Sequence, residues 1–395
     1  MFGRGFLCLS LLLVLVNPHR VRGQANGIYA DFTTSMGCFT CKLEYAFAPK
    51  TVANFIGLAT GQRPWLDLST GLAKTNPFYN GITFHRVITN FVIQAGSPKG
   101  DGTDGPGYFV PDEITTSLRF TKAYMLAMAN SGTNSNGSQF FLTVSPQTGL
   151  NNGYTIFGEL VGGTNTVLNI NHVAVDANDK PLTNVSIQSV GIRRVGTAAQ
   201  AFDINTNNLP FVTNLPLQFA TVSTQISLAF SNRLYADNRL YSSTNLANWG
   251  GESLGIEIAL PATNSIQITN DSPQRFFRMG QVQYATSTLS PKNLLNRRLV
   301  LTITSAPSRT VNIQFDSSRT GTFTSGSTTG SITDYNWTQE PYRGFLLVGF
   351  STTIPVYYLN CDFSGTGGGR LSGTAYPNYP FTFGAYSLAG RFTVN

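Results

Sequence analysis

Hydrophobic and polar residues alternate along much of this chain, and a period of two is typical of β-strands. Between residues 28 and 47 the alternation is interrupted by turn residues, which predicts a β-hairpin. It is clearest toward the C-terminal end, in RRLVLTIT, RTVNIQF and SLAGRFTV. The apolar residues of each segment there share one face: Leu299, Leu301 and Ile303; Val311, Ile313 and Phe315; Leu388, Phe392 and Val394.

A helical period stands out in only one segment, APKTVANFIGLATG. Pro49 occupies a first-turn position and Gly61 follows the last periodic residue, so a helix is predicted over 49–60. A weaker helical pattern covers 164–171. The apolar positions of the stronger helix are Val52, Phe55, Ile56 and Ala59.

The first 25 residues have the layout of a secretory signal peptide. Arg4 precedes an apolar run from Phe6 to Val16, which is short for a membrane span. We expect cleavage near Gly23 or Ala25, with an uncleaved anchor as the alternative. No later segment is apolar enough to cross a membrane. The leader predicts an exported bacterial protein that is periplasmic, cell-surface or extracellular.

A chain of 395 residues is too long for one ordinary domain. Changes in residue composition and in the hydrophobic pattern divide the chain. They predict a signal peptide (1–25), a first domain (26–195), a linker (196–208), a small β-sandwich-like domain (209–284), a second linker (285–297) and a C-terminal all-β domain (298–395). The predicted fold class is all-β throughout, and the last two units could also form one larger domain.

Charge argues against nucleic acid as a partner. Only 11% of residues are charged, and loss of Arg4, Arg20 and Arg22 with the leader lowers the formal charge from +7 to +4. No basic cluster is interleaved with aromatic residues.

Three cysteines remain after removal of the leader: Cys38, Cys41 and Cys361. CFTC has redox spacing, but it lies in a predicted strand, where alternation sends Cys38 and Cys41 to opposite faces. The sequence favours small core residues or one incidental disulfide, and it contains no metal-site pattern.

Several catalytic motifs fail on context. GDGTDG at 100–105 matches the GxGxxG motif of nucleotide-binding loops, but no predicted helix follows it. We therefore predict a surface loop. Only His85 and His172 remain in the mature chain, with no G-x-S-x-G or HExxH motif. A hydrolase triad assembled from distant residues stays open as an alternative.

Four segments taken together resemble the cyclophilins, the peptidyl-prolyl cis-trans isomerases. They are PKTVANFIGLATG, FHRVITNFVIQAGSP, MLAMANSGTNSNGSQFFLT and LNNGYTIFGELVGG, and the resemblance covers roughly 26–195. It implies a closed eight-stranded antiparallel barrel capped by two helices. It also implies that the chain acts on proline-containing polypeptides without metal or cofactor.

The resemblance assigns site residues position by position. Arg86 in FHR looks like the catalytic arginine. The residues similar to the family's substrate-binding positions are Phe91, Val92, Gln94, Ala129, Asn130, Gln139, Phe141, Leu150 and Tyr154.

Gly149 departs from the family pattern. Many members carry there a tryptophan that binds cyclosporin, so we expect weak cyclosporin binding and an open pocket wall. This departure and the long C-terminal extension keep an alternative open: a catalytically weak or inactive proline-peptide-binding module of a secreted surface or adhesion protein.

The reaction explains why an arginine suits the site. Twisting an X–Pro bond breaks amide resonance against a barrier of about 20 kcal/mol, and the prolyl nitrogen regains a lone pair. A guanidinium donates to it at every relevant pH. Such a bond contributes about 1.5–3 kcal/mol, whereas a 10^5-fold acceleration needs about 7, so an apolar pocket must supply the rest. We expect Arg86 on the outer face of the barrel, although a solvated strand-edge arginine is the alternative, and we expect His85 to be structural.

The C-terminal half offers weaker signals. Residues 240–253 and 272–280 resemble a β-sandwich segment appended to secreted bacterial proteins. Trp337, Tyr342 and Tyr357 either belong to a core or line a groove for a glycan, a peptide or an envelope partner.

Overall fold

The computed structural model describes residues 25–395 except 223–224, 232, 234–235, 258–262, 270–273, 285–293, 306–307, 317–319, 341, 351–355, 366–367, 377–385 and 395. All of the predicted leader except Ala25, and most of the predicted linker 285–297, lie outside the described residues. No helix in the described part of the chain is long and apolar enough to span a membrane.

The first region is an eight-stranded antiparallel sheet in the order β10-β1-β2-β9-β7-β8-β6-β5. The predicted hairpin is its β1–β2 pair. The strands are β1 (Gly27–Thr34), β2 (Gly37–Leu43), β5 (Arg86–Ile88), β6 (Val92–Ala95), β7 (Met125–Met128), β8 (Phe140–Thr143), β9 (Ile156–Gly162) and β10 (Ile187–Val195).

The barrel closes between its two edge strands without a continuous ladder. Thr83 forms a bridge with Ser186, and the Phe84 amide donates to the Val185 carbonyl at 2.9 Å. The predicted eight-stranded cyclophilin-like barrel is therefore confirmed.

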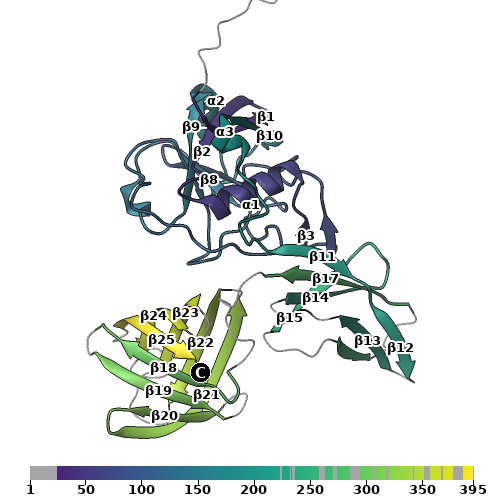
Figure 1. Ribbon diagram of the computed structural model, residues 1–395, viewed down its shortest axis with the longest axis vertical. Helices are drawn as coiled ribbons and strands as arrows, with labels where there is room; N and C mark the ends of the chain where they lie inside the picture. Colours follow the sequence, from purple (N-terminus) through teal and green to yellow (C-terminus); the bar gives the residue numbers. More distant parts are fainter. Residues whose placement is uncertain are drawn as a thin grey trace, which may run out of the picture.

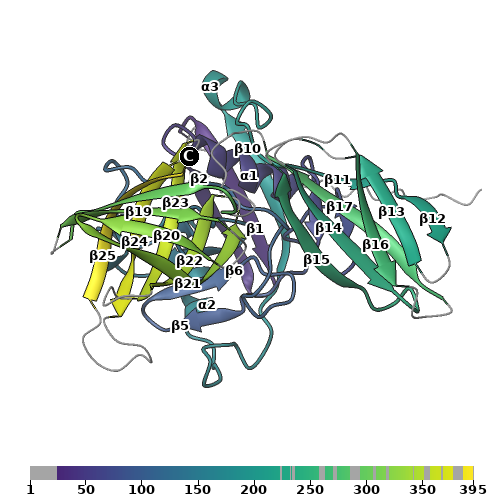
Figure 2. The same cartoon turned by 90° about the horizontal axis from the view of Figure 1, so that it is seen from below.

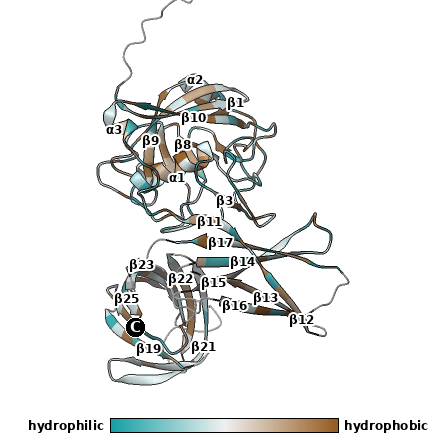
Figure 3. Ribbon diagram, turned by 45° about the vertical axis from the view of Figure 1, so that its right-hand side comes forward, coloured by the Kyte–Doolittle hydropathy of each residue, from teal (hydrophilic) through white to brown (hydrophobic). Residues whose placement is uncertain are grey.

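Both predicted helices are confirmed to the residue. Helix α1 (Pro49–Thr60) begins with proline in its first turn and ends at Gly61, which adopts φ +70°. Helix α2 is Thr164–Asn171. The short helices η1 (Thr148–Leu150) and α3 (Thr197–Gln200) are additional. In Figure 3 the apolar colouring gathers on α1 and on β8, at the centre of the first region.

A two-stranded hairpin, β3 (Trp65–Asp67) and β4 (Leu72–Lys74), leaves the barrel and contacts the middle region. In Figure 1, β3 lies beside β11 at the junction of the two regions. The middle region consists of a four-stranded sheet, β11-β17-β14-β15, and a three-stranded sheet, β12-β13-β16. Its strands are β11 (Phe211–Leu215), β12 (Gln218–Val222), β13 (Gln225–Ser231), β14 (Ala236–Ser243), β15 (Gly250–Glu257), β16 (Thr263–Thr269) and β17 (Phe276–Gln283).

The C-terminal region is a second barrel, closed by an antiparallel meander of eight strands (Figure 2). The strands are β18 (Arg298–Ile303), β19 (Arg309–Phe315), β20 (Gly321–Ser325), β21 (Thr328–Glu340), β22 (Arg343–Phe350), β23 (Val356–Gly365), β24 (Gly368–Tyr376) and β25 (Tyr386–Val394). The alternating residues predicted to share a face are all buried in its core.

Aromatic and sulfur side chains in the described residues are mainly structural. Tyr342 and Tyr357 are buried and Trp337 is half-buried against the barrel core, so the core interpretation holds for the two tyrosines. Cys38 is exposed and Cys41 is buried, as alternation predicts, and neither forms a disulfide. Burial raises the pKa of the Cys41 thiol, which makes it an inert core group.

Candidate active site

The site begins with the register of three neighbouring strands, β5, β6 and β8. Arg86 lies opposite Gln94, and Gln94 lies opposite Phe141. Because side chains alternate across a sheet, these three residues share the outer face. Their neighbours Val87 and Ile93 point into the barrel core.

The outer face carries its own apolar cluster, separate from the barrel core. Phe141 is 5% exposed and contacts Tyr154 edge-on, with ring centroids 5.3 Å apart. Phe120 stacks on its other side at 6.0 Å. The buried members are Val92, Phe120, Met125, Ala127, Phe141 and Ile156, flanked by the partly buried Phe91, Leu118, Ala129, Leu150 and Tyr154. Six of the residues predicted from sequence therefore come together here.

A polar rim borders the cluster. The Gln94 Nε2 donates to Gln139 Oε1 at 3.2 Å, and Gln139 Nε2 donates to the carbonyls of Gly102 and Asp104 at 2.8 and 2.9 Å. Asn130 Nδ2 donates to the Gly153 carbonyl at 2.9 Å. These bonds hold the amide side chains beside the apolar surface, where they can meet a peptide backbone.

Arg86 lies at the open side of this arrangement. Its side chain is 42% exposed, and its Nε lies 3.5 Å from Asp179 Oδ2, which is equally exposed. Such an exposed pair contributes less than about 1 kcal/mol, so the guanidinium can turn toward a bound peptide at little cost. Arg86 thus lies on the outer face of the edge strand β5, and its role in catalysis stays a prediction.

His85, next to Arg86, faces the other way. It is buried, and neither ring nitrogen has a partner among the described residues. Burial lowers its pKa, with smaller opposing effects from Asp101 and Asp104. The imidazole stays neutral near pH 7, which agrees with a structural histidine.

A cavity of about 460 Å³ adjoins the rim. It is reached past Gln94, Ala129, Asn130 and Gln139, so four of the predicted residues form its border with the apolar cluster. Its far side is the loop Gly102–Phe109 together with Leu68 and Arg239. The loop that contains GDGTDG is thus a wall of this cavity.

Sequence reasoning missed Phe120 and the cavity loop. Phe120 lies in a stretch without periodicity, and no pattern marks it as a partner of Phe141. The loop offered a signal, since its glycines and Asp104 stand between two site segments. Gly149, by contrast, was identified from sequence, and a Cβ there would meet no atom within 4 Å, so a larger side chain has room at this position next to Leu150.

Comparisons with known proteins agree with this geometry. The profile of the family described as "Cyclophilin type peptidyl-prolyl cis-trans isomerase/CLD" matches residues 29–192. Peptidyl-prolyl cis-trans isomerase B of Streptomyces anulatus is 48% identical over 170 residues, which span 42% of this chain and 97% of that protein. Peptidyl-prolyl cis-trans isomerase A of Mycobacterium tuberculosis is 45% identical over 165 residues, spanning 41% and 91%.

Among solved structures, a cyclophilin type peptidyl-prolyl cis-trans isomerase of Cryptosporidium parvum is 30% identical, with a TM-score of 0.38 over 42% of this chain and 98% of that one.

The sequence matches define the class as an enzyme that rotates prolyl peptide bonds. The chain belongs to the cyclophilin-type peptidyl-prolyl cis-trans isomerase family. The matches to these relatives cover about two fifths of the chain, in its first region.

Proposed function

We propose that this isomerase acts on X–Pro bonds of exported or envelope proteins and that Arg86 stabilises the twisted bond. The observation that supports this is the register Arg86–Gln94–Phe141 on one outer face. It sets a cationic donor two strands away from an apolar surface that fits a proline ring.

In the proposed mechanism the proline ring packs against Phe141 and Val92. The prolyl nitrogen becomes pyramidal as the bond twists, and Arg86 donates to its lone pair. This interaction exists in the transition state and in neither planar ground state, so it accelerates the reaction. No bond is cleaved, and no proton leaves the protein.

The polar rim supplies the remaining orientation. Gln94 and Asn130 hold the flanking carbonyl and amide of the peptide, while the apolar cluster favours the less polar twisted amide over the planar form. Together these contributions supplement the 1.5–3 kcal/mol or so expected from Arg86.

The proposed setting rests on the leader. A signal peptide over 1–25 would direct the chain to the periplasm, cell surface or exterior, where unfolded clients with X–Pro bonds arrive. We retain the proposed domains 26–195, 209–284 and 298–395 with linkers between them. A glycan or envelope partner for the C-terminal units stays a prediction.

Weak cyclosporin binding is a further part of the proposal. It is supported by Gly149, beside which the site lacks a wall. A cyclic apolar peptide would lose contact area on that side.

The experiment compares Arg86→Ala with Arg193→Ala in the full mature chain, using a proline-containing test peptide. Arg193 is a matched control, because it is also about half exposed and paired with an aspartate, Asp31. We expect kcat/KM to fall about 10- to 100-fold for Arg86→Ala, from the loss of one charge-assisted hydrogen bond. Arg193→Ala should stay within twofold of wild type.

Equal activity of Arg86→Ala and wild type would overturn the proposed role. A wild-type chain that binds the peptide without accelerating its isomerisation would instead support the alternative, an inactive proline-peptide-binding module.

A further inference from the structure

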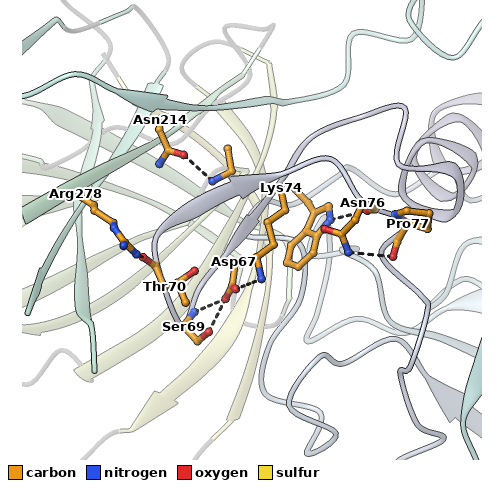
Figure 4. Close-up of polar contacts among 10 residues, drawn as sticks. Asp67, Ser69, Thr70, Lys74, Asn76, Pro77, Asn214 and Arg278 are labelled. Atoms are coloured by element: carbon orange, nitrogen blue, oxygen red, sulfur yellow. Dashed lines mark hydrogen bonds and ion pairs between the residues drawn. The ribbon is translucent and has the colours of Figure 1, made fainter. Parts of the chain in front are cut away.

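The hairpin β3–β4 joins the isomerase barrel to the middle region through specific polar contacts. Ala73 N donates to Asn214 Oδ1 at 2.8 Å, and Asn214 Nδ2 donates to the Gly71 carbonyl at 2.7 Å. An Arg278 guanidinium nitrogen donates to the Thr70 carbonyl at 3.0 Å. Figure 4 shows Asn214 and Arg278 approaching the hairpin from the middle region.

Apolar packing makes the same junction tight. A Cβ at Gly71 would lie 2.4 Å from the Tyr241 ring, and one at Gly280 would lie 2.7 Å from Leu66. Leu66 and Val282 belong to the same core cluster. The middle region is therefore fixed against the barrel.

This junction places a residue of the middle region at the peptide site. Arg239 on β14 and Leu68 from the hairpin loop line the 460 Å³ cavity that begins at Gln94 and Asn130. The family profile matches residues 29–192, so Arg239 lies outside the matched segment.

Arg239 is held in place and still accessible. Its Nε donates to Asp237 Oδ2 at 2.9 Å, and the Asp237 side chain is only 4% exposed. The Arg239 side chain remains 22% exposed. A guanidinium has five N–H groups, and those of Arg239 also meet Tyr241 on the same strand. The bond to Asp237 uses one and the contact with Tyr241 another, so Arg239 has donors left for a ligand.

The other polar groups of the cavity also favour a ligand that accepts hydrogen bonds from Arg239. Among the described lining residues, Arg239 is the only one with a positive charge. Asp104 is the one acid, and its carboxylate already accepts hydrogen bonds from Ser97 Oγ and the Lys99 amide. The remaining polar side chains of the lining are all amides or hydroxyls, among them Gln94, Thr103, Asn130 and Gln139.

We propose that Arg239 is a specificity-determining residue of the isomerase, donated by the middle region. It binds the side-chain oxygen of a glutamate or glutamine located within two residues of the isomerised X–Pro bond. This inference rests on the peptide site proposed above, which the cavity adjoins. The appended region thereby selects among clients.

The test measures kcat/KM of the full mature chain on peptides that carry Glu, Gln, Ala or Lys at each of the two positions before and after the X–Pro bond. At one position we expect wild type to favour Glu and Gln over Ala by about fivefold to tenfold, and Ala over Lys. Arg239→Met should reduce the Glu-to-Ala ratio to about one.

Two controls keep the outcome clear. Arg275→Met removes a cation of the middle region that contacts neither the cavity nor the hairpin, since Arg275 donates to the Thr269 carbonyl, and it should keep the wild-type ratio. Arg239→Met combined with Asp237→Asn removes the buried negative charge together with its cationic partner, and it should give the same ratio of about one.

Equal rates for all four side chains at every position in wild type would overturn the proposal, as would a wild-type ratio in Arg239→Met. A failure of the Arg86 mechanism looks different, because Arg86→Ala lowers the rates of all peptides together or leaves them all unchanged.

Discussion

The two eight-stranded barrels of this chain differ in how their outer faces are built. In the first barrel, β7 and β8 are buried on both faces, and Phe140 and Phe141 belong to separate clusters on opposite sides. In the C-terminal barrel, β19 buries Val311 and Ile313 on its inner face, while Thr310, which points to the outer face, is exposed. This second apolar face is where the candidate binding site of the first barrel lies.

The largest expected difference concerns two phenylalanines. Phe315→Ala should destabilise the C-terminal barrel by about 3–5 kcal/mol, because Phe315 is fully buried in that barrel's own core. Isomerase activity at 20 °C should stay within twofold. Phe141→Ala should instead lower kcat/KM at least tenfold. Urea unfolding and peptide assays on both variants test this, and loss of activity in Phe315→Ala would break the separation.

The junction with the middle region gives the next largest effect. Gly71 has φ +71° and no room for a Cβ beside Tyr241, so Gly71→Ala should cost about 2–3 kcal/mol of unfolding free energy. Gly81→Ala is the matched control, because Gly81 has φ +83° and open space around it, so only about 1 kcal/mol of backbone strain is expected. Equal destabilisation would mean that the junction is not tightly packed.

The open wall beside Leu150 predicts a gain of function. Gly149→Trp should tighten cyclosporin binding about tenfold, because an indole placed there adds apolar contact area. Gly250→Trp, on an uncrowded position of the middle region, should leave the affinity unchanged. Titration by fluorescence would measure both, and equal affinities of Gly149→Trp and wild type would contradict the open wall.

The smallest effects concern pH. Isomerase activity should be flat from about pH 6 to 9, because Arg86 stays protonated and the reaction needs no acid or base. A rate that falls as the pH is lowered from 7 to 6 would mean that the reaction needs an unprotonated group, and it would contradict this account.

Stability should respond where activity does not. The pKa of His85 is lowered in the fold, so below about pH 6.5 the unfolded chain binds the extra proton and the first barrel loses stability. Each pKa unit between the unfolded and folded states corresponds to a loss of at most about 1.4 kcal/mol of unfolding free energy. The C-terminal barrel has no histidine and should lack this dependence. Urea unfolding of wild type and of His85→Gln between pH 5 and 7.5 distinguishes the pH dependence of the first barrel from the behaviour of the C-terminal barrel.

Local patterns predicted much of the fold. Pro49 and Gly61 mark the start and the end of α1 in the sequence, as in the structure. The alternation of apolar and polar residues in β18 and β19 predicted which face of each strand lies in the barrel core. The motifs that contain Arg86, Gln94 and Phe141 were also recognisable in the sequence. The register of β5, β6 and β8 places these three residues in one row on the same face.

The parts that escaped prediction depend on contacts between distant segments. Phe120 joins the site through a loop with no period, and Arg239 lies a hundred residues or more from every other cavity residue in sequence. Arg63 is similar: it is buried, and its guanidinium donates to the Leu209 and Pro210 carbonyls at 3.2 and 2.8 Å. Nothing in the local sequence distinguishes these arginines from solvated ones.

The central claim is that Arg86 acts in the transition state rather than in peptide binding. The most direct measurement is the separate determination of kcat and KM for Arg86→Ala, by exchange spectroscopy on a proline peptide over a range of concentrations that includes saturation. The account predicts a kcat lowered about 10- to 100-fold with KM changed less than threefold. An unchanged kcat with a raised KM would contradict it.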